Sequence, residues 1–458
     1  MMESIFFRLL REDDKELALR RCIADLRTGL ENDSAHTVRQ DTLTLLPGSP
    51  MPYWVSDEIR RMFQETMLYS SSNAGGKVQH GMATKDDTRF LRLWWEVSPE
   101  QVGRSARWVN YAKGGEFLRY HSDIHLVVDW EDDGQKLEKF LLQKYPYLNG
   151  NTDWILHPEC SYYEPGLTYS RRTQKGFSAR ILPEGCRFDK NGPGIFASNS
   201  ADHLYQLGFF NSRLVALFVD MLVAFGSYET GIIGNIPYVK PHFEQRSSVS
   251  LYARECFALK RDLDRVNEIS HAFTRPALLG LQVTNLKCLV KDLSGEPDNL
   301  KQRFLSWLAM QETAEVQITE NSYQIDQAVL DLYRIAERDR HTIDREVGPH
   351  PGSYPRKAEW AEEDDTRLRL LYPTKELLPD EDESDDEEGE DGGGQRSGVG
   401  RRTAQRSTYR TLEEVAHNLG VHPASIAVRR QVLGLYRPDE FAETVAGLIS
   451  YCVGCLFG

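Results

Sequence analysis

GLTYSRRTQKGFSARILPEGCRFDKNGPGIF, residues 166–196, is the stretch that decides the fold class. Its short runs of aromatic and branched residues alternate with Gly, Pro, Asn and Asp, which is typical of strands joined by turns. The same texture begins near residue 78, whereas the residues before about 50 and after 204 have apolar side chains at helical spacing. We therefore expect the α+β class, with a β-rich domain followed by a helical region and a small C-terminal helical module. The stretch also contains six basic residues, and their role in a strand-rich region needs an explanation. They are Arg171, Arg172, Lys175, Arg180, Arg187 and Lys190.

The 458 residues suggest about three domains. We expect a helical junction at residues 1–50, a β-rich domain at 51–248 and a helical region at 249–347. Residues 348–408 are rich in charge and poor in apolar side chains, so we expect a mostly disordered acidic linker there. A C-terminal helical module should occupy residues 409–458, and its apolar ending without a polar tail suggests a chain that is cut rather than finished.

The charge is unevenly distributed along the chain. The net charge is −14, and residues 376–391 contain eleven acidic residues and no basic one, so the remaining residues carry about −3. The acidic balance therefore does not exclude a nucleic-acid partner. The seven cysteines are scattered and no signal peptide or membrane segment is apparent, which suggests free thiols and a cytoplasmic location.

Basic and aromatic residues gather in three segments. The first is HGMATKDDTRFLRLWWEV (residues 80–97), the second is YAKGGEFLRYHSDIHLVVDW (111–130), and the third is the opening stretch. Lys and Arg between turn glycines can hold phosphates, and Arg can also read guanine in the major groove. Glycines such as Gly114 and Gly176 would allow a backbone to approach a ligand closely. A solvated sheet edge protected by charge is the other interpretation, and composition leaves both open.

Two further patterns have alternative interpretations. His121, Asp123 and His125 lie on one face of an expected strand, either as metal ligands or as hydrogen-bonding residues, and the missing fourth ligand favours the latter. TLEEVAHNLGVHPASIAVRRQ (residues 411–431) has the rhythm of a helix-turn-helix, with Gly420 in the turn and Pro423 at the second helix start. That pair of helices either reads DNA or only packs.

Catalytic signatures are mostly absent from the sequence. There is no GxGxxG after a strand, no Walker A loop and no GxSxG elbow. Asn235-Ile-Pro-Tyr238 resembles the NPPY motif of amino-methyltransferases, in which the aromatic ring stacks on an extruded base. Ile236 replaces the first proline, and no S-adenosylmethionine-binding glycine motif precedes it. We therefore interpret this segment as a loop.

The three segments, in this order, resemble the target-recognition region of PglX-type adenine-specific DNA methyltransferases. These enzymes belong to bacterial phage-exclusion systems (BREX and the related Pgl and DISARM systems) and are relatives of type IIG restriction-modification enzymes. The first segment is also similar to the opening of the TaqI-like specificity domain, and ISYCVGCLFG (residues 449–458) resembles the last recognisable block of the family. The family's catalytic domain would lie before residue 1.

The resemblance implies that this chain recognises double-stranded DNA for site-specific N6-adenine methylation. It implies no cofactor in this chain, with S-adenosylmethionine bound by a catalytic domain or subunit elsewhere, and no catalytic activity of the chain alone. Other phage-defence proteins are further possible partners, and no membrane contact is expected. Carrying the family's DNA contacts onto the matching positions gives this set: Thr84, Lys85, Arg89, Lys113, Thr168, Tyr169, Arg171, Arg172, Lys175 and Arg180. The alternative is a non-catalytic protein-interaction subunit of a defence complex, whose basic surface is incidental.

Overall fold

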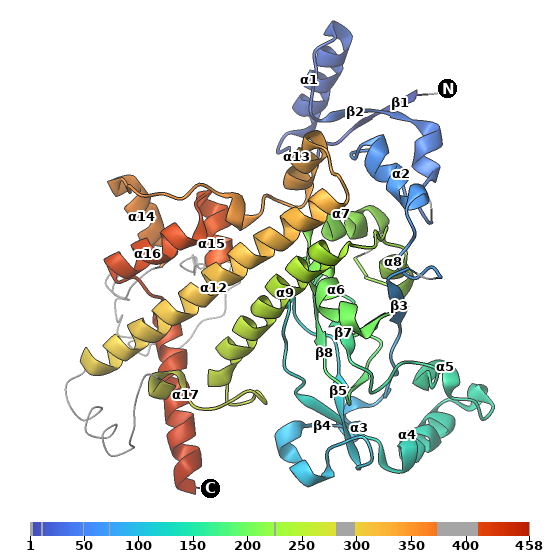
Figure 1. Cartoon of the computed structure of the whole chain (residues 1–458), viewed down its shortest axis with the longest axis vertical. Helices are drawn as coiled ribbons and strands as arrows, with labels where there is room; N and C mark the ends of the chain where they lie inside the picture. Colours follow the sequence, from blue (N-terminus) through green and yellow to red (C-terminus); the bar gives the residue numbers. More distant parts are fainter. Residues whose placement is uncertain are drawn as a thin grey trace, which may run out of the picture. The chain divides into compact units, whose positions relative to one another are not determined.

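A computed structural model of the chain describes residues 3–10, 12–48, 50–72, 74–223, 226–280, 298–372 and 411–457. The chain divides into two compact units. Unit 1 comprises Met1–Asp264, Ile269–Ala272 and Glu320–His350, and unit 2 comprises Arg265–Glu268, Phe273–Thr319 and Pro351–Gly458. Within the described residues the chain combines small sheets with many helices, which confirms the predicted α+β class (Figure 1).

The β-rich part of unit 1 contains two four-stranded sheets in the described residues, with strand orders β3-β10-β7-β8 and β4-β6-β5-β9. All neighbouring strands are antiparallel except β5 and β9, which are parallel. The strands are β3 (Gly76–Gln79), β4 (Leu91–Leu93), β5 (Trp108–Ala112), β6 (Leu126–Asp129), β7 (Gly166–Tyr169), β8 (Ala179–Leu182), β9 (Arg187–Phe188) and β10 (Gly194–Ala197). The opening stretch therefore provides β7 to β10, as its turn-punctuated texture predicted.

One apolar core joins the two sheets. Leu182 of β8 and Phe196 of β10 share a buried cluster with Val109 of β5 and Val128 of β6. Leu141 of the helix α4 (Glu131–Lys144) closes this cluster. Short helical elements complete the region: α3 (Asp87–Phe90), 3₁₀ turns at Trp94–Glu96, Pro99–Gln101 and Pro146–Leu148, and α5 (Asp153–Leu156).

The amino-terminal part of unit 1 differs from the helical prediction for residues 1–50. Strand β1 (Glu3–Phe7) pairs antiparallel with β2 (Ala35–Arg39), and the helix α1 (Lys15–Thr28) lies between them in sequence. Cross-strand pairing overrides the helical spacing of the first apolar residues because it satisfies their backbone groups. A 3₁₀ turn (Gln40–Thr44) and α2 (Asp57–Glu65) follow.

A helical layer of unit 1 follows the sheets. It contains a 3₁₀ turn (Ser200–Asp202), α6 (His203–Phe210), α7 (Arg213–Leu222), α8 (Thr230–Gly234), α9 (Phe243–Leu263), the end of α12 (Asp298–Leu332) and α13 (Glu337–Glu346). α6 contacts β7, β8 and β10 on one side and α9 on the other (Figure 1). The Ser212 hydroxyl caps α7 by accepting a hydrogen bond from the Val215 N–H.

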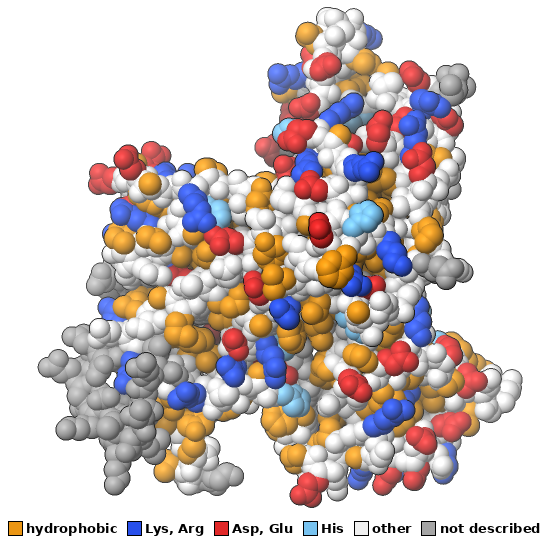
Figure 2. Space-filling view, viewed as in Figure 1, with side chains coloured by type: hydrophobic (Ala, Val, Ile, Leu, Met, Phe, Trp, Pro, Cys, Tyr) orange, Lys and Arg blue, Asp and Glu red, His pale blue; other side chains and the backbone are white. Residues whose placement is uncertain are grey.

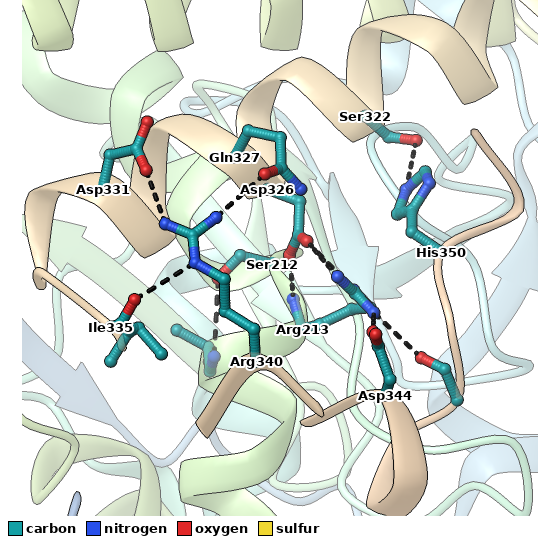
Figure 3. Close-up of polar contacts among 12 residues, drawn as sticks. Ser212, Arg213, Ser322, Asp326, Gln327, Asp331, Ile335, Arg340, Asp344 and His350 are labelled. Atoms are coloured by element: carbon teal, nitrogen blue, oxygen red, sulfur yellow. Dashed lines mark hydrogen bonds and ion pairs between the residues drawn. The ribbon is translucent and has the colours of Figure 1, made fainter. Parts of the chain in front are cut away.

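Ion pairs and hydrogen bonds connect the helices of this layer (Figure 3). The Arg213 guanidinium contacts the Asp326 carboxylate of α12 at 2.8 Å and also pairs with Asp344 of α13. Arg340 of α13 donates to the Gln327 side chain at 3.0 Å and pairs with Asp331 at 2.6 Å. Charge-assisted hydrogen bonds of this kind fix helix positions that apolar packing alone leaves less specific.

Unit 2 contains the predicted helix-turn-helix. α15 (Leu412–Leu419) ends at Gly420, whose φ of 64° is left-handed, and α16 (Pro423–Leu433) begins with Pro423. The other described elements include α10 (Ala277–Gly280), the first part of α12, a 3₁₀ turn (Pro351–Ser353), α14 (Glu362–Leu371) and α17 (Pro438–Phe457), and a short 3₁₀ turn spans Asp264–Val266.

Part of the segment for which a linker was predicted is folded. Leu368 and Tyr372 are buried with Leu412, Val415 and Ile426 in one apolar cluster of unit 2. α14 therefore belongs to the core of the C-terminal helices, because its few apolar residues meet theirs. The acidic tract itself lies outside the described residues.

Candidate nucleic-acid interface

The three basic and aromatic segments meet in the structure. The N–H of Lys190 donates to the carbonyl of Met82 at 3.1 Å, and the N–H of Asp189 donates to the carbonyl of Ala112 at 2.8 Å. The hydroxyl of Tyr111 donates to the Asp189 carboxylate at 2.8 Å. Segments that are up to about a hundred residues apart in sequence are thus joined by backbone and buried side-chain bonds.

Gly114 allows this junction to form. A Cβ atom on Gly114 would lie 2.5 Å from the carbonyl oxygen of Asn191, and the φ of Gly114 is 22°. The close approach expected at this glycine is therefore to the third segment itself. Gly176 differs, since its φ is 101° and a Cβ there would meet no atom within 4 Å, so this glycine serves the turn between β7 and β8.

Four lysines surround the junction, and we call them the lysine cluster: Lys85, Lys113, Lys144 and Lys190. The Lys144 ammonium at the end of α4 donates to the Lys85 carbonyl at 2.9 Å. Lys113 pairs with Asp87, which also accepts a hydrogen bond from the Thr84 hydroxyl. The backbone of Lys85 has a φ of 59°, a left-handed conformation that is uncommon outside glycine.

The electrostatics of the lysine cluster are dominated by cations. Burial lowers the pKa of Lys85, and the charges of Lys190 and Lys144 lower it further, while Asp189 opposes them. Burial raises the pKa of Asp87, but hydrogen bonds from Lys113 and Thr84 and the charge of Lys190 outweigh it and give a net decrease. The four ammonium groups of the lysine cluster therefore interact with two carboxylates, those of Asp87 and Asp189. An anion placed there would relieve the repulsion among the lysines.

Other predicted contact residues lie in the protein interior. Thr84, Thr168, Tyr169 and Arg180 are all buried. The Thr168 hydroxyl donates to the Gly192 carbonyl at 3.1 Å, and the Arg180 guanidinium donates to the Ser170 hydroxyl at 3.2 Å. Strand β7 is buried on both faces, so alternate positions do not reach solvent. These four side chains support the junction from within.

The remaining predicted residues are at or near the surface. Arg172 and Lys175 are exposed on the turn between β7 and β8. Arg89 is exposed above the Phe140 ring, with 5.0 Å between its guanidinium carbon and the ring centroid. Arg171 is half-buried and forms an ion pair with Glu229 at 2.6 Å, so its charge is already matched by a carboxylate. Figure 2 shows Lys and Arg interspersed with Asp and Glu on the face in view, so local clusters matter more than a broad basic surface.

His121, Asp123 and His125 do not form a metal site. The Asp123 carboxylate contacts the His125 ring at 3.2 Å and the His271 ring at 2.9 Å, and among the described residues no group of three metal-ligating side chains is close enough to hold an ion. The hydrogen bond with Asp123 raises the pKa of His125. The Asp123 carboxylate accepts a hydrogen bond from the backbone N–H of His271 at 3.2 Å and is bonded to the His271 ring at 2.9 Å, so the geometry supports the hydrogen-bonding interpretation for Asp123.

The NIPY segment is structural. Ile236 and Tyr238 are buried, and the Ile236 carbonyl accepts a hydrogen bond from the Tyr69 N–H at 2.9 Å. The Pro237 carbonyl accepts from the Tyr333 hydroxyl at 2.8 Å. The Ile236 and Pro237 carbonyls and the Tyr238 ring are thus used inside unit 1, as expected for a loop rather than a base-binding motif.

The arginines of α16 are paired within unit 2. Arg429 pairs with Asp365 of α14, and Arg430 is buried between Glu312 at 2.9 Å and Glu440 at 2.5 Å. The exposed positions of α16 include Val428 and Val432, which are apolar. Of the two interpretations of the helix-turn-helix, this geometry favours packing over DNA reading.

Sequence reasoning missed Lys144, Tyr147 and Trp154. They lie outside the three segments, on α4, the following 3₁₀ turn and α5. Tertiary contacts that no local pattern reveals, such as the bond between Lys144 and Lys85, connect them with the candidate interface. None of the described helices is long and apolar enough to cross a membrane.

The chain is similar in sequence to two adenine-specific methyltransferases. It is 25% identical over 344 residues to the adenine-specific methyltransferase PglX of Lacticaseibacillus casei (strain Zhang), covering 72% of this chain and 27% of that protein. It is also 25% identical over 244 residues to the adenine-specific methyltransferase BrxX of Escherichia coli O9:H4 (strain HS), covering 52% of this chain and 18% of that protein. The chain thus spans about a quarter or less of these relatives. No protein-family model matches.

Among solved structures, one that is similar is the type IIL restriction-modification enzyme MmeI in complex with DNA. The TM-score is 0.38 at 14% sequence identity, and the likeness covers 60% of this chain and 35% of that chain.

Proposed function

We propose that this chain recognises DNA targets for N6-adenine methylation in a bacterial phage-defence system. The observation that carries the proposal is the lysine cluster, where the three segments converge and positive charge exceeds negative charge. The relatives of this chain are adenine-specific methyltransferases. Methylation of adenine is therefore the reaction for which the proposed DNA contact would select the site. The methyl transfer itself, with S-adenosylmethionine as donor, is assigned to a catalytic domain or subunit that carries the motifs missing from this sequence.

The proposed contacts divide into two groups. Lys85, Lys144 and Lys190 would hold phosphates, because ammonium groups bind them as point charges without reading sequence. Arg89 on α3 and Arg172 and Lys175 on the turn between β7 and β8 are exposed within the same segments and would reach the sugar-phosphate backbone or base edges. Thr84, Thr168, Tyr169 and Arg180 would keep the segments in register, and Lys113 would orient Asp87.

The salt dependence of DNA binding tests this proposal. The logarithm of the affinity should fall linearly with the logarithm of salt concentration, with a slope of about one unit per phosphate contact. The variant K85Q/K144Q/K190Q should lower that slope by about three units. The variant K15Q/R20Q/R21Q removes three exposed cations of α1 and should leave the slope near that of the unmodified chain.

The same titration separates the proposal from the protein-interaction alternative. A chain that serves only as an interaction subunit would show no salt-dependent DNA binding at any ionic strength. An equal decrease of the slope in both triple variants would mean that net charge, rather than the lysine cluster, attracts DNA, and would refute the assignment of this site. Purified chain that transfers labelled methyl groups on its own would contradict the division of labour.

A further inference from the structure

Two exposed aromatic side chains lie side by side next to the lysine cluster. Tyr147 is 64% exposed and Trp154 is 58% exposed. Their ring centroids are 6.3 Å apart, with an angle of 44° between the ring planes. Large aromatic rings are usually buried or interfacial, because leaving them in water forgoes a large hydrophobic gain. An exposed pair therefore indicates a surface that binds something flat and apolar.

The pair is held in place by buried neighbours. Leu148, directly after Tyr147, and Ile155, directly after Trp154, are both in the apolar core of the β-rich part. The Ile155 carbonyl accepts a hydrogen bond from the N–H of Ala83, the residue before Thr84 in the first segment. The backbone on both sides of the two rings is thus anchored, which presents them outward in a fixed arrangement.

The aromatic pair is continuous with the lysine cluster. The Lys144 ammonium lies 5.8 Å from the centroid of the Tyr145 ring, and the Tyr145 and Tyr147 rings are 5.7 Å apart. The rings of Tyr145, Tyr147 and Trp154 therefore form a continuous row that begins beside the Lys144 ammonium, and a strand with a phosphate on Lys144 can extend along this row to place a planar group on Tyr147 and Trp154. The exposed Asp153 begins α5 beside Trp154 in sequence, so the positive charge comes from the Lys144 side of the pair.

We propose that Tyr147 and Trp154 form a stacking platform for one unpaired nucleobase of a DNA strand whose backbone phosphates rest on the lysine cluster. A nucleotide combines the two features that this surface selects, a phosphate and a flat ring, and stacking on aromatic side chains tolerates any base sequence. An enzyme that modifies a base must take that base out of the duplex, so unpaired nucleotides arise during the proposed reaction. This inference rests on the proposed function.

The test uses two DNA duplexes of the same arbitrary sequence that differ at one nucleotide. One is fully paired, and the other carries a single unpaired aminopurine, a fluorescent adenine analogue whose emission is quenched on stacking. The unmodified chain should bind the second duplex about tenfold more tightly and quench its fluorescence. The variant Y147A/W154A should lose both the preference and the quenching while its affinity for the paired duplex is unchanged. Y147L/W154L should behave in the same way and guards against a local loss of structure.

Two controls make the outcomes distinguishable. Phe243 on α9 is 73% exposed and lies 5.8 Å from the Arg246 guanidinium carbon, so F243A removes an exposed aromatic ring beside a cation at another site and should change neither readout. K85Q/K144Q/K190Q should weaken binding of both duplexes. Preference and quenching that persist in Y147A/W154A would overturn the stacking inference alone. Absence of binding to either duplex by the unmodified chain would overturn the proposed function and this inference with it.

Discussion

Arg213 and the lysine cluster use positive charge in opposite ways within unit 1. Arg213 is largely buried, and two carboxylates, Asp326 and Asp344, match its single charge. The lysine cluster brings four ammonium groups together beside Asp87 and Asp189, and burial together with the charges of Lys190 and Lys144 lowers the pKa of Lys85. A buried pair is satisfied without any ligand, whereas a cluster with excess positive charge is stabilised by an added anion.

The residues around a cationic side chain, rather than its residue type, therefore indicate its role. Arg171 and Arg172 are adjacent in sequence, yet Arg171 pairs with Glu229 and Arg172 is exposed on a turn. Burial and pairing therefore divide a single basic stretch into structural and candidate binding residues. Four changes can break or sharpen this division.

The largest effect is expected at the buried ion pair. Removing the Asp326 side chain in D326A leaves Arg213 largely buried with only Asp344 to match it, so the free energy of unfolding should fall by about 3 to 5 kcal/mol. Urea denaturation measures this change in the free energy of unfolding. Asp331, which pairs with Arg340, has a side chain that is 67% exposed, and D331N should cost less than about 1 kcal/mol. Similar losses in both variants would show that burial does not separate the two pairs.

A smaller effect is expected on the turn between β7 and β8. Because Arg172 and Lys175 are exposed on this turn, R172Q/K175Q should weaken DNA binding about tenfold. The matched variant R171Q breaks the pair with Glu229 and should change DNA affinity by less than about twofold. A larger loss of affinity in R171Q than in R172Q/K175Q would reverse the roles assigned to these neighbours. Fluorescence anisotropy with a labelled duplex measures both affinities.

A pH-dependent effect is expected at Asp123. Its hydrogen bond raises the pKa of His125 above 6.5, so this contribution to stability is complete below pH 6.5 and is lost as the pH rises through the folded-state pKa. The pKa of Asp123 is lowered from its ordinary value of 3.8. The contribution of the ionised Asp123 carboxylate to stability is therefore fully present above about pH 3.8. D123N should therefore destabilise unit 1 most near pH 5, by less than about 1 kcal/mol because His125 is partly exposed, and least near pH 8. Thermal melts across this range test the trend, and a loss that grows with pH would contradict it.

The smallest effect on binding is expected at Arg180. Burial lowers its pKa to about 10, and its guanidinium bonds to the Ser170 hydroxyl rather than to a carboxylate. R180M keeps the length and the apolar packing of the side chain, so DNA affinity should change by less than about twofold. A loss of affinity comparable to that of R172Q/K175Q would restore Arg180 as a direct contact.

Local sequence signals predicted the elements well. The α+β class, the strands within residues 166–196 and the turn at Gly420 all depend on nearby residues, and the structure confirms them. Long-range contacts account for the differences. Residues Glu3–Phe7 form a strand because β2 pairs with them, and α14 folds because apolar residues beyond the acidic tract cover it.

The candidate site was only partly predictable for the same reason. Alternation along a strand reveals an exposed face only when one face is solvated, and β7 is buried on both, so the burial of Thr168 and Tyr169 could not be seen. Lys144 joins Lys85 through a contact between a helix end and a turn 59 residues away. No pattern in the sequence encodes that distance.

The most direct test of the account is to measure which lysines DNA protects from chemical acetylation, by mass spectrometry of the intact chain with and without a duplex. We predict that Lys85, Lys144 and Lys190 lose reactivity when DNA binds at low salt, and that Lys15 on α1 and Lys139 on α4 keep theirs. Unchanged reactivity of the three cluster lysines under conditions in which DNA is bound would contradict the claim that the junction of the three segments is the DNA-binding surface.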